Sequence, residues 1–198
     1  MVIRELTTDD LAAAIGVVAR AMCDNPLDIA ALGDDRDARL QRLHRMFKIA
    51  LPRILRKGVM LGAFDGEMLA GVAAMLPPGR CQPSATEKIT LVPRMIRALG
   101  LGGFGRLGRW LGEWSRHDLR EAHWHLGPVA VDPNLQGRGI GRALMDASCG
   151  RIDRVGAASY LETDKPQNVE FYKKYGFETV EEASILGTPN WFMRRRPQ

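Results

Sequence analysis

The stretch that most constrains the fold is residues 127–143, GPVAVDPNLQGRGIGRA. Val129–Val131 is a short apolar and β-branched run, which is typical of a buried strand. Asp132-Pro133-Asn134 ends that strand, because proline fixes φ and asparagine suits a turn. A glycine-rich segment follows and leads into a helical pattern that carries Ala143, Leu144 and Ala147 on one face. The stretch therefore predicts a strand, a sharp turn and the start of a helix.

Glycines at alternate positions make this turn a candidate anion site. Gly137, Gly139 and Gly141 let the backbone approach a ligand closely and expose successive N–H groups. These groups lie at the positive end of the helix dipole, where phosphate binds well. Arg138 and Arg142 add full positive charge. The predicted ligand carries phosphate, foremost a pyrophosphate.

Two common phosphate-binding loops do not fit the segment. A P-loop requires G-x-x-x-x-G-K-S/T, and a dinucleotide fingerprint requires G-x-G-x-x-G. Counted from Gly137, the sixth position is Arg142, and counted from Gly139 it is Leu144. The pattern Q/R-x-x-G-x-G/A does fit, through Gln136, Gly139 and Gly141. That turn resembles the one found in the GCN5-related N-acetyltransferase (GNAT) superfamily.

Length and composition set the broad class. The chain has 198 residues, of which 45% are apolar, so it can bury one sizeable core, and we expect a single domain over residues 1–198. No run of about 18 apolar residues predicts a membrane span, and the acidic start lacks a signal peptide's apolar region. Cys23, Cys81 and Cys149 are odd in number and widely spaced, which indicates reduced thiols in a cytoplasmic protein. The net charge of +5 suits an anionic cofactor.

Periodicity and turn residues predict the order strand, helix, helix, strand, strand, insertion, strand, helix, strand, helix, strand, strand. Thr7 or Thr8 should cap the first helix, and Pro52 should kink or split the second. The expected strands cover residues 2–6, 59–64, 68–76, 123–131, 157–163, 177–186 and 191–196. The expected helices cover residues 7–21, 36–57, 140–155 and 168–175, with a further helical segment at 89–99 inside the insertion of residues 77–121.

The insertion contains a basic segment with two tryptophans. Aromatic side chains among arginines could stack on the bases of a single-stranded nucleic acid. Leu107, Trp110, Leu111 and Trp114 also form an apolar stripe at helical spacing, and such stripes are more often buried. We therefore expect a core-facing helix, which could still cover a substrate pocket.

Pro128 interrupts the strand at residues 123–131. Because proline lacks an N–H group for ladder hydrogen bonds, it predicts an edge, a bulge or a point where two strands part. The following strand-helix-strand unit predicts parallel pairing, with a ligand site at the carboxyl ends of the strands. The glycine-rich turn lies at that end.

A second motif supports the resemblance. Residues 168–177, NVEFYKKYGF, are similar to the N-x-x-x-Y-x-x-x-G-F pattern of the GNAT superfamily. Leu161-Glu162-Thr163 before it and Trp191-Phe192-Met193 after it are most similar to the branch that contains puromycin N-acetyltransferase. The resemblance covers nearly the whole chain. It implies an α/β fold with a mixed, strongly twisted sheet of about seven strands and helices on both faces.

The resemblance also implies acetyl-coenzyme A as the acetyl donor. The backbone of Val129, Ala130 and Val131 would pair with the pantetheine arm, and Asn168 and Phe171 would contact it. Tyr172 would protonate the departing thiolate. The residues that would hold the pyrophosphate through their N–H groups are Gln136, Gly137, Arg138, Gly139, Ile140, Gly141 and Arg142.

The residue that takes the proton from the acceptor stays open. Glu162 is the first candidate, His125 and His123 are the next, and a chain of water molecules is an equal alternative. His123 and His125 share one face of a strand, but no third metal ligand is evident, so no metal is expected. Cys149 has no basic neighbour in sequence, which favours direct transfer over an acetyl-cysteine intermediate.

The acceptor is the least defined part of the prediction. The leading interpretation is a primary amine of a small molecule, because the insertion suggests a covered pocket. A peptide or protein amine is the nearest alternative, and a non-catalytic acyl-coenzyme A sensor is another. We expect no nucleic-acid or membrane partner, while the family resemblance makes a homodimer possible.

Overall fold

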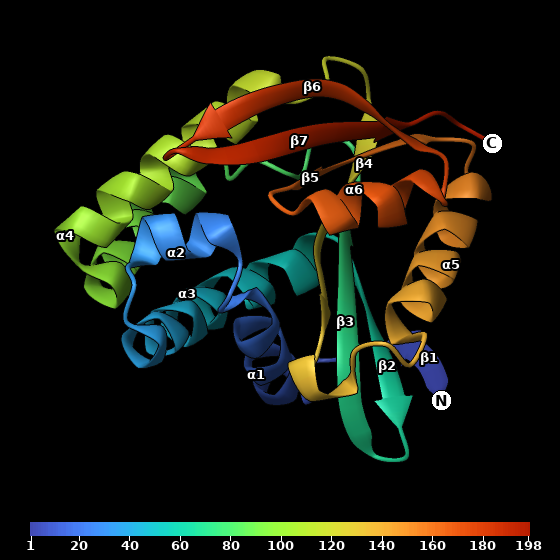
Figure 1. The fold of residues 1–198 in the computed structure, drawn as a ribbon, viewed down its shortest axis with the longest axis horizontal. Helices are drawn as coiled ribbons and strands as arrows, with labels where there is room; N and C mark the ends of the chain where they lie inside the picture. Colours follow the sequence, from blue (N-terminus) through green and yellow to red (C-terminus); the bar gives the residue numbers. More distant parts are fainter.

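The computed structural model describes all 198 residues and contains a seven-stranded mixed sheet flanked by helices on both faces (Figure 1). The strands lie in the order β1-β2-β3-β4-β5-β7-β6. This architecture confirms the predicted fold class. The strands are β1 Val2–Glu5, β2 Val59–Asp65, β3 Met68–Leu76, β4 His123–Val131, β5 Ala158–Thr163, β6 Phe177–Ile185 and β7 Thr188–Arg195. The helices are α1 Leu11–Met22, α2 Pro26–Leu32, α3 Arg36–Lys57, α4 Ala85–His117, α5 Ile140–Asp153 and α6 Pro166–Lys173, with a 3-10 turn at Pro133–Leu135.

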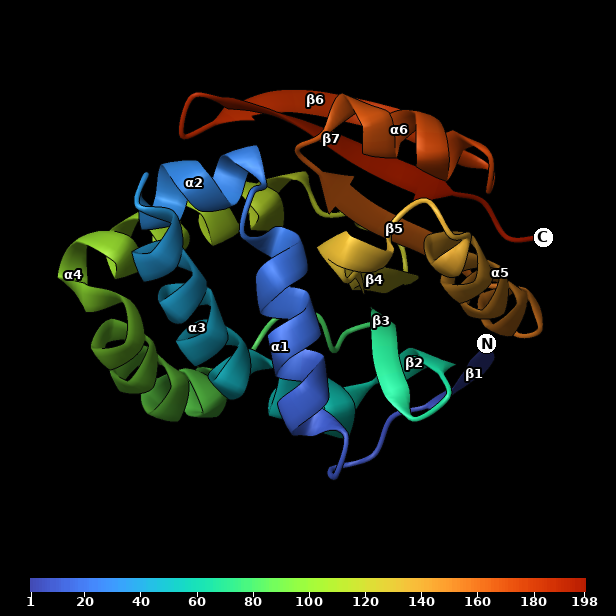
Figure 2. The same ribbon diagram turned by 60° about the horizontal axis from the view of Figure 1, so that its bottom comes forward.

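Two hydrophobic cores lie on opposite faces of the sheet. One core lies between the sheet and the four helices α1, α2, α3 and α4, and it includes Tyr160 and Phe192. The other joins α5 and α6 to the sheet and includes Leu144 and Phe177. Figure 2 shows the two groups of helices on either side of the strands. The alternation of residues on each strand supplies apolar side chains to both cores.

The sheet changes character at β4. The strands β1 to β4 pair in an antiparallel manner, as do β5, β7 and β6. Only β4 and β5 run parallel, as the strand-helix-strand pattern predicted, and they pair over just three residues of each strand. The last pair is His125 with Tyr160. Beyond it the two strands separate.

A bulge in β4 lies directly after this last pair. Ala73 of β3 pairs with Val129, whereas Met75 pairs with Leu126, so β4 has one residue more than β3 in this interval. The extra length contains Gly127-Pro128, whose peptide bond is cis. The prediction that Pro128 marks a bulge or a parting of strands is therefore confirmed on both counts.

The structure differs from the sequence-based expectation at three places in the first half of the chain. The residue at the N-cap of α1 is Asp10 rather than Thr7 or Thr8. The Asp10 carboxylate accepts hydrogen bonds from the Thr7 N–H (2.8 Å) and from Arg4. The segment after Asn25 forms a short helix, α2, because Pro26 suits a first helical turn. Helix α3 continues through Pro52 as one helix over residues 36–57, because its apolar face packs on the core, so the split does not occur and a kink at Pro52 stays a prediction.

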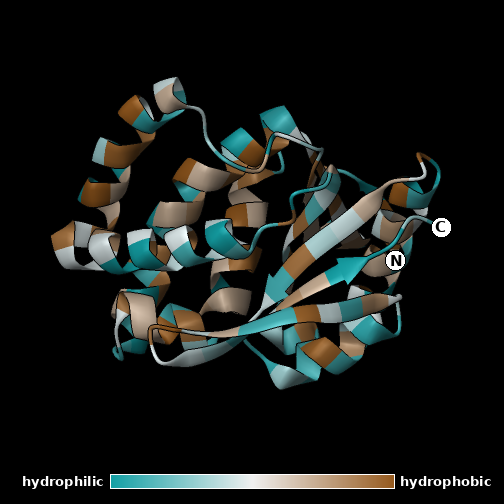
Figure 3. Ribbon diagram, turned by 90° about the horizontal axis from the view of Figure 1, so that it is seen from above, coloured by the Kyte–Doolittle hydropathy of each residue, from teal (hydrophilic) through white to brown (hydrophobic).

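The insertion forms a longer helix than expected. Ser84 and Glu87 make a reciprocal capping box that begins α4, well before residue 89. Gly100 has φ +71°, a left-handed conformation, and divides α4 into two helical parts. Figure 3 shows hydrophobic and hydrophilic residues alternating along the helices, as expected for amphipathic elements with one buried face.

The two tryptophans of α4 face inward. Trp110 is buried, and its ring meets that of Trp114 edge to face at a centroid distance of 5.1 Å. The Trp114 indole N–H donates to Oδ1 of Asn190 on β7 (3.2 Å). Leu107 is buried as well, but Leu111 is exposed, so that part of the predicted stripe is wrong. The ring faces that base stacking would need are thus engaged in packing.

No helix in the structure combines the length and the apolar character that crossing a bilayer requires.

Candidate functional site

The site is built around the fork between β4 and β5. Past His125, β4 continues to Val131 with β3 on one side and no strand on the other. The N–H and C=O groups on that open side of Val129–Val131 therefore lack a partner within the sheet. Such an edge can pair with an extended ligand as a strand would.

The glycine turn lies at the end of this open edge. Gly137 and Gly139 have φ values of +78° and +79°, and Gly139 directly precedes the first residue of α5. A Cβ atom added at either glycine would meet nothing within 4 Å, so the space over the turn is open. Arg138 and Arg142 are exposed beside it. The turn thus offers N–H groups, a helix N-terminus and two cations to one anionic ligand.

Contacts join the turn to the neighbouring elements. The Gln136 side-chain amide donates to the carbonyl of Val131 (3.4 Å). A Cβ atom at Gly141 would lie 3.7 Å from both Phe171 of α6 and Val131 of β4, so these three residues adjoin. Ile140 contributes only its backbone to the surface, because its side chain is buried in the core. The structure therefore brings the two sequence motifs together.

An ion pair that sequence reasoning missed anchors the turn to α1. Arg20 donates from Nε and Nη2 to Oδ2 of Asp132, at 3.0 and 2.7 Å. The other carboxylate oxygen accepts from the Asn134 N–H (3.1 Å). Burial opposes ionisation, but these partners lower the pKa of Asp132 overall. Asp132 was recognised only as a turn residue, since nothing in the sequence pairs it with α1.

Helix α6 places the predicted cofactor and acid residues. The Asn168 side-chain amide donates to Oγ1 of Thr163 at the end of β5 (3.1 Å). Tyr172 is buried, and its hydroxyl has no hydrogen-bond partner in the protein. Burial foremost, and then the charge of Asp164, raise the pKa of Tyr172. The side chain therefore keeps its proton at neutral pH, as a general acid must.

The first two candidates for the proton acceptor lie together. Nε2 of His125 lies 3.0 Å from Oε2 of Glu162, and the Glu162 side chain is only 3% exposed. Nδ1 of His125 lies 3.2 Å from the sulfur of Cys81. Burial alone would lower the pKa of His125, but Glu162 and Cys81 together raise it well above its usual value. Glu162 is therefore not an isolated base, and the candidate is the pair.

His123 has a separate carboxylate partner. Its Nε2 lies 3.0 Å from Oδ1 of Asp118, in the loop that follows α4. Donor atoms of Asp118, His123 and His125 all lie within 4.8 Å of one another. The expectation that the two histidines have no third potential ligand is wrong. No sequence pattern pointed to Asp118, because only the path of the insertion places that loop beside β4.

The cysteines differ in their surroundings. Cys149 is buried in α5, and burial raises its pKa to about 11, which fits the prediction that it is not a nucleophile. Cys23 is also buried, with a raised pKa. Cys81 alone lies beside a histidine at the fork, a neighbour that sequence separation concealed.

Comparisons with known proteins agree with this geometry. The model of the acetyltransferase (GNAT) domain matches residues 97–179, which include the end of the insertion, β4, the glycine turn, α5, β5 and α6. A mycothiol acetyltransferase from Saccharomonospora viridis is 41% identical over 56 residues. That match covers 27% of this chain and only 18% of the length of that relative.

Solved structures share the fold across the whole chain. A structure from Corynebacterium glutamicum, described as histone acetyltransferase HPA2 and related acetyltransferase, has a TM-score of 0.78 at 20% identity and covers 99% of this chain and 96% of its own. A GNAT-family acetyltransferase from Brucella melitensis, in complex with acetyl-CoA, has a TM-score of 0.55 at 17% identity, with 98% and 86% coverage. The chain thus matches the GNAT fold, and its residues 97–179 match the model of the acetyltransferase (GNAT) domain.

Proposed function

We propose that this protein is an acetyl-CoA-dependent N-acetyltransferase that moves an acetyl group directly to the primary amine of a small molecule. The observation that carries the proposal is the convergence of three features at the fork. These features are the open edge of Val129–Val131, the uncovered glycine turn at the start of α5, and the buried His125–Glu162 pair.

The residues present fit acetyl-CoA. The glycine turn from Gln136 to Arg142 would hold the pyrophosphate through backbone N–H groups and positive charge. The open edge of Val129–Val131 would pair with the pantetheine arm, and Asn168 and Phe171 would flank it. The related protein from Brucella melitensis was solved with acetyl-CoA bound, which supports this choice of donor. When bound, acetyl-CoA supplies an activated thioester carbonyl.

The chain's own residues handle two protons. Above its own pKa, the His125–Glu162 pair can accept the proton that the amine loses. Tyr172 holds a proton on a hydroxyl that no protein group engages, and it can give this proton to the leaving sulfur. An N–H group of Val129 or Ala130 at the open edge can stabilise negative charge on an oxygen that develops beside it. These roles need no covalent intermediate.

A small-molecule acceptor is favoured over a peptide by the position of the insertion. Helix α4 packs against α2 and α3, and the carbonyl of His117 at its end accepts a hydrogen bond from the hydroxyl of Tyr160 (3.1 Å). The loop after α4 then brings Asp118 beside the fork. We therefore expect the insertion to restrict the approach of an extended peptide to the fork. The resemblance to the branch of puromycin N-acetyltransferase stays a prediction.

A purely sensory role is disfavoured by the proton-handling residues. An acyl-CoA sensor would need the turn and the open edge, but it has no use for a buried His–Glu pair and an unpartnered tyrosine hydroxyl. Release of free thiol from acetyl-CoA distinguishes the two functions. We expect release with some members of a panel of small primary amines, and less with peptides that have free N-termini.

Initial-rate kinetics with the best amine would then test direct transfer. Intersecting double-reciprocal lines are expected for a ternary complex. Parallel lines would contradict direct transfer. Release of thiol with peptides but with none of the small amines would show that the acceptor is a peptide. Binding of acetyl-CoA without release for any acceptor would favour the sensor.

A further inference from the structure

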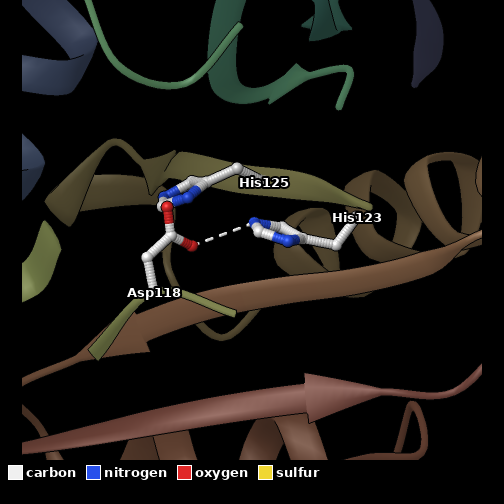
Figure 4. A group of neighbouring side chains, drawn as sticks. All are labelled: Asp118, His123 and His125. Atoms are coloured by element: carbon white, nitrogen blue, oxygen red, sulfur yellow. Dashed lines mark ion pairs between the residues drawn. The ribbon is translucent and has the colours of Figure 1, made fainter. Parts of the chain in front are cut away.

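Asp118, His123 and His125 form a cluster whose geometry goes beyond acetyl transfer. Figure 4 shows the Asp118 carboxylate between the two imidazole rings. One donor atom from each residue lies within 4.8 Å of the other two. His123 is buried, while His125 and Asp118 have side chains that are 13% and 21% exposed. The cluster is thus sheltered but can still be reached from solvent.

The two ring nitrogens of His123 both face oxygen atoms. Nδ1 lies 2.8 Å from the carbonyl oxygen of Glu121, which can only accept a hydrogen bond, so Nδ1 carries a proton. Nε2 lies 3.0 Å from Oδ1 of Asp118. The space between Nε2 and this oxygen can hold either a proton or a metal ion that replaces the proton.

The geometry at Asp118 is close to that of a metal site. Oδ1 of Asp118 is buried and lies 3.0 Å from Nε2 of His123. In a tetrahedral site each metal–ligand bond is about 2.0–2.2 Å long, and the two donor atoms are about 3.4 Å apart. A movement of a few tenths of an ångström would therefore admit an ion bonded to both atoms.

Both histidines have the outer partners that metal-binding histidines use. The carbonyl of Glu121 holds one ring nitrogen of His123, and the carboxylate of Glu162 holds one ring nitrogen of His125. Backbone carbonyls and carboxylates in these positions fix the ring orientation and increase the basicity of the ligating nitrogen. The remaining nitrogen of His125, Nδ1, lies 3.2 Å from the sulfur of Cys81, a further donor that suits the same class of metal.

We propose that Asp118, His123 and His125 bind a divalent transition-metal ion of the zinc class, with Glu162 and the Glu121 carbonyl orienting the two imidazoles. Two imidazoles and one carboxylate form a donor set that zinc accepts, and they leave a fourth position for water or the Cys81 thiolate. The hard cations Mg²⁺ and Ca²⁺ prefer oxygen ligands, so this site selects against them.

The site has a consequence for catalysis that rests on the proposed function. The metal and the proton released by the amine would compete for His125, so an occupied site should inhibit acetyl transfer. Metal binding itself requires no acetyl-CoA and no acceptor. A failure of the metal site and a failure of the proposed function are therefore distinguishable.

The test is a zinc titration of the chelator-stripped full-length protein in competition with a chromophoric chelator. Wild type should bind one equivalent of zinc per chain. His123→Gln and Asp118→Asn should each weaken binding at least about tenfold, and Glu162→Gln should weaken it by about 10–100-fold through the outer partner. His44→Gln, which changes an exposed histidine on α3, should bind as wild type does.

The absorption spectrum of the cobalt-substituted wild type gives a second readout that needs no variant. Intense visible bands that zinc abolishes are expected from a tetrahedral site, and a sulfur charge-transfer band would place Cys81 among the ligands. Substoichiometric zinc binding by wild type, or equal binding by folded His123→Gln, would overturn the proposal. Circular dichroism identifies a variant that fails to fold. In that case the cobalt spectrum of wild type tests the metal site without a variant.

Discussion

Nε2 of His125 lies 3.0 Å from Oε2 of Glu162, and His125 is the last residue of β4 that pairs with β5. The strands therefore separate where a buried carboxylate and an imidazole meet. An acceptor amine that enters the fork would find a largely buried proton acceptor there, with side chains that are 13% (His125) and 3% (Glu162) exposed.

Glu162→Gln should remove the charge that makes the pair a proton acceptor. We expect kcat to fall by about 10²-fold or more, the usual contribution of a general base, while acetyl-CoA binding changes little. Because loss of one partner of a buried pair can cost about 3–5 kcal/mol, folding is checked first by thermal unfolding. Glu178→Gln on exposed β6 is the control. A folded Glu162→Gln enzyme with wild-type kcat would exclude the pair as the base.

The pH dependence of kcat/KM should report the His125–Glu162 pair. The pKa of His125 is raised, so the pair is already protonated at a pH where an ordinary histidine, with a pKa of about 6.5, is neutral. It can accept a proton only above its own pKa. We therefore expect kcat/KM to fall as the pH drops through a midpoint above about 6.5.

The variant His125→Gln separates this decrease of kcat/KM at low pH from the titration of the acceptor amine. With the same amine, the amine's own protonation affects both enzymes equally, so the difference between the two profiles belongs to the pair. The decrease of kcat/KM at low pH should disappear or shift to another pH in the variant. Identical profiles would mean that solvent water, and not the pair, takes the proton from the amine.

Tyr172→Phe should slow the reaction without weakening the complex. The side chain loses only a hydroxyl that makes no hydrogen bond in the protein, so stability should change little. Loss of the general acid predicts a decrease in kcat of about 10²–10⁴-fold. Tyr175→Phe, which removes a hydroxyl that donates to the carbonyl of Arg142 (3.3 Å), is the control on the same segment. Equal decreases in both variants would argue against a specific role for Tyr172.

Ser84→Ala should destabilise the insertion. Ser84 accepts from the Glu87 N–H (3.2 Å) and its own N–H donates to the Glu87 carboxylate (2.9 Å), so one substitution disrupts the capping box. The expected loss is about 1 kcal/mol in the free energy of unfolding, measured by denaturant titration. Thr90→Ala, on the exposed side of α4, should change it by less than about 0.5 kcal/mol. A cost no larger than that of the control would mean that the first turn of α4 does not limit stability.

The sequence predicted the parts of the fold that local chemistry decides. Pro128 indicated the fork, the glycines indicated the turn, and the segment from Asn168 to Gly176 indicated the helix α6. These features depend on backbone geometry within a few residues, and patterns of glycine, proline and apolar residues record such geometry directly.

The sequence did not predict contacts that depend on tertiary structure. Cys81 and Asp118 come from the two ends of the insertion, and only its folded path brings both to His125. Pro52 did not split α3, because packing of the helix outweighs one lost hydrogen bond. The pairing of Glu162 with His125 required knowledge of the register between β4 and β5, which hydropathy alone does not fix.

The most direct test of the account is isothermal titration of acetyl-CoA into wild type, Gly139→Trp and Gly187→Trp. Both glycines have φ near +80° and open space around them, so each substitution imposes a similar backbone strain of about 1–2 kcal/mol. Only Gly139 lies in the turn at the start of α5, whereas Gly187 lies between β6 and β7. We predict that wild type and Gly187→Trp bind acetyl-CoA, while Gly139→Trp binds at least about 100-fold more weakly. Absence of binding to wild type, or equal binding by both variants, would contradict the placement of the cofactor on the glycine turn.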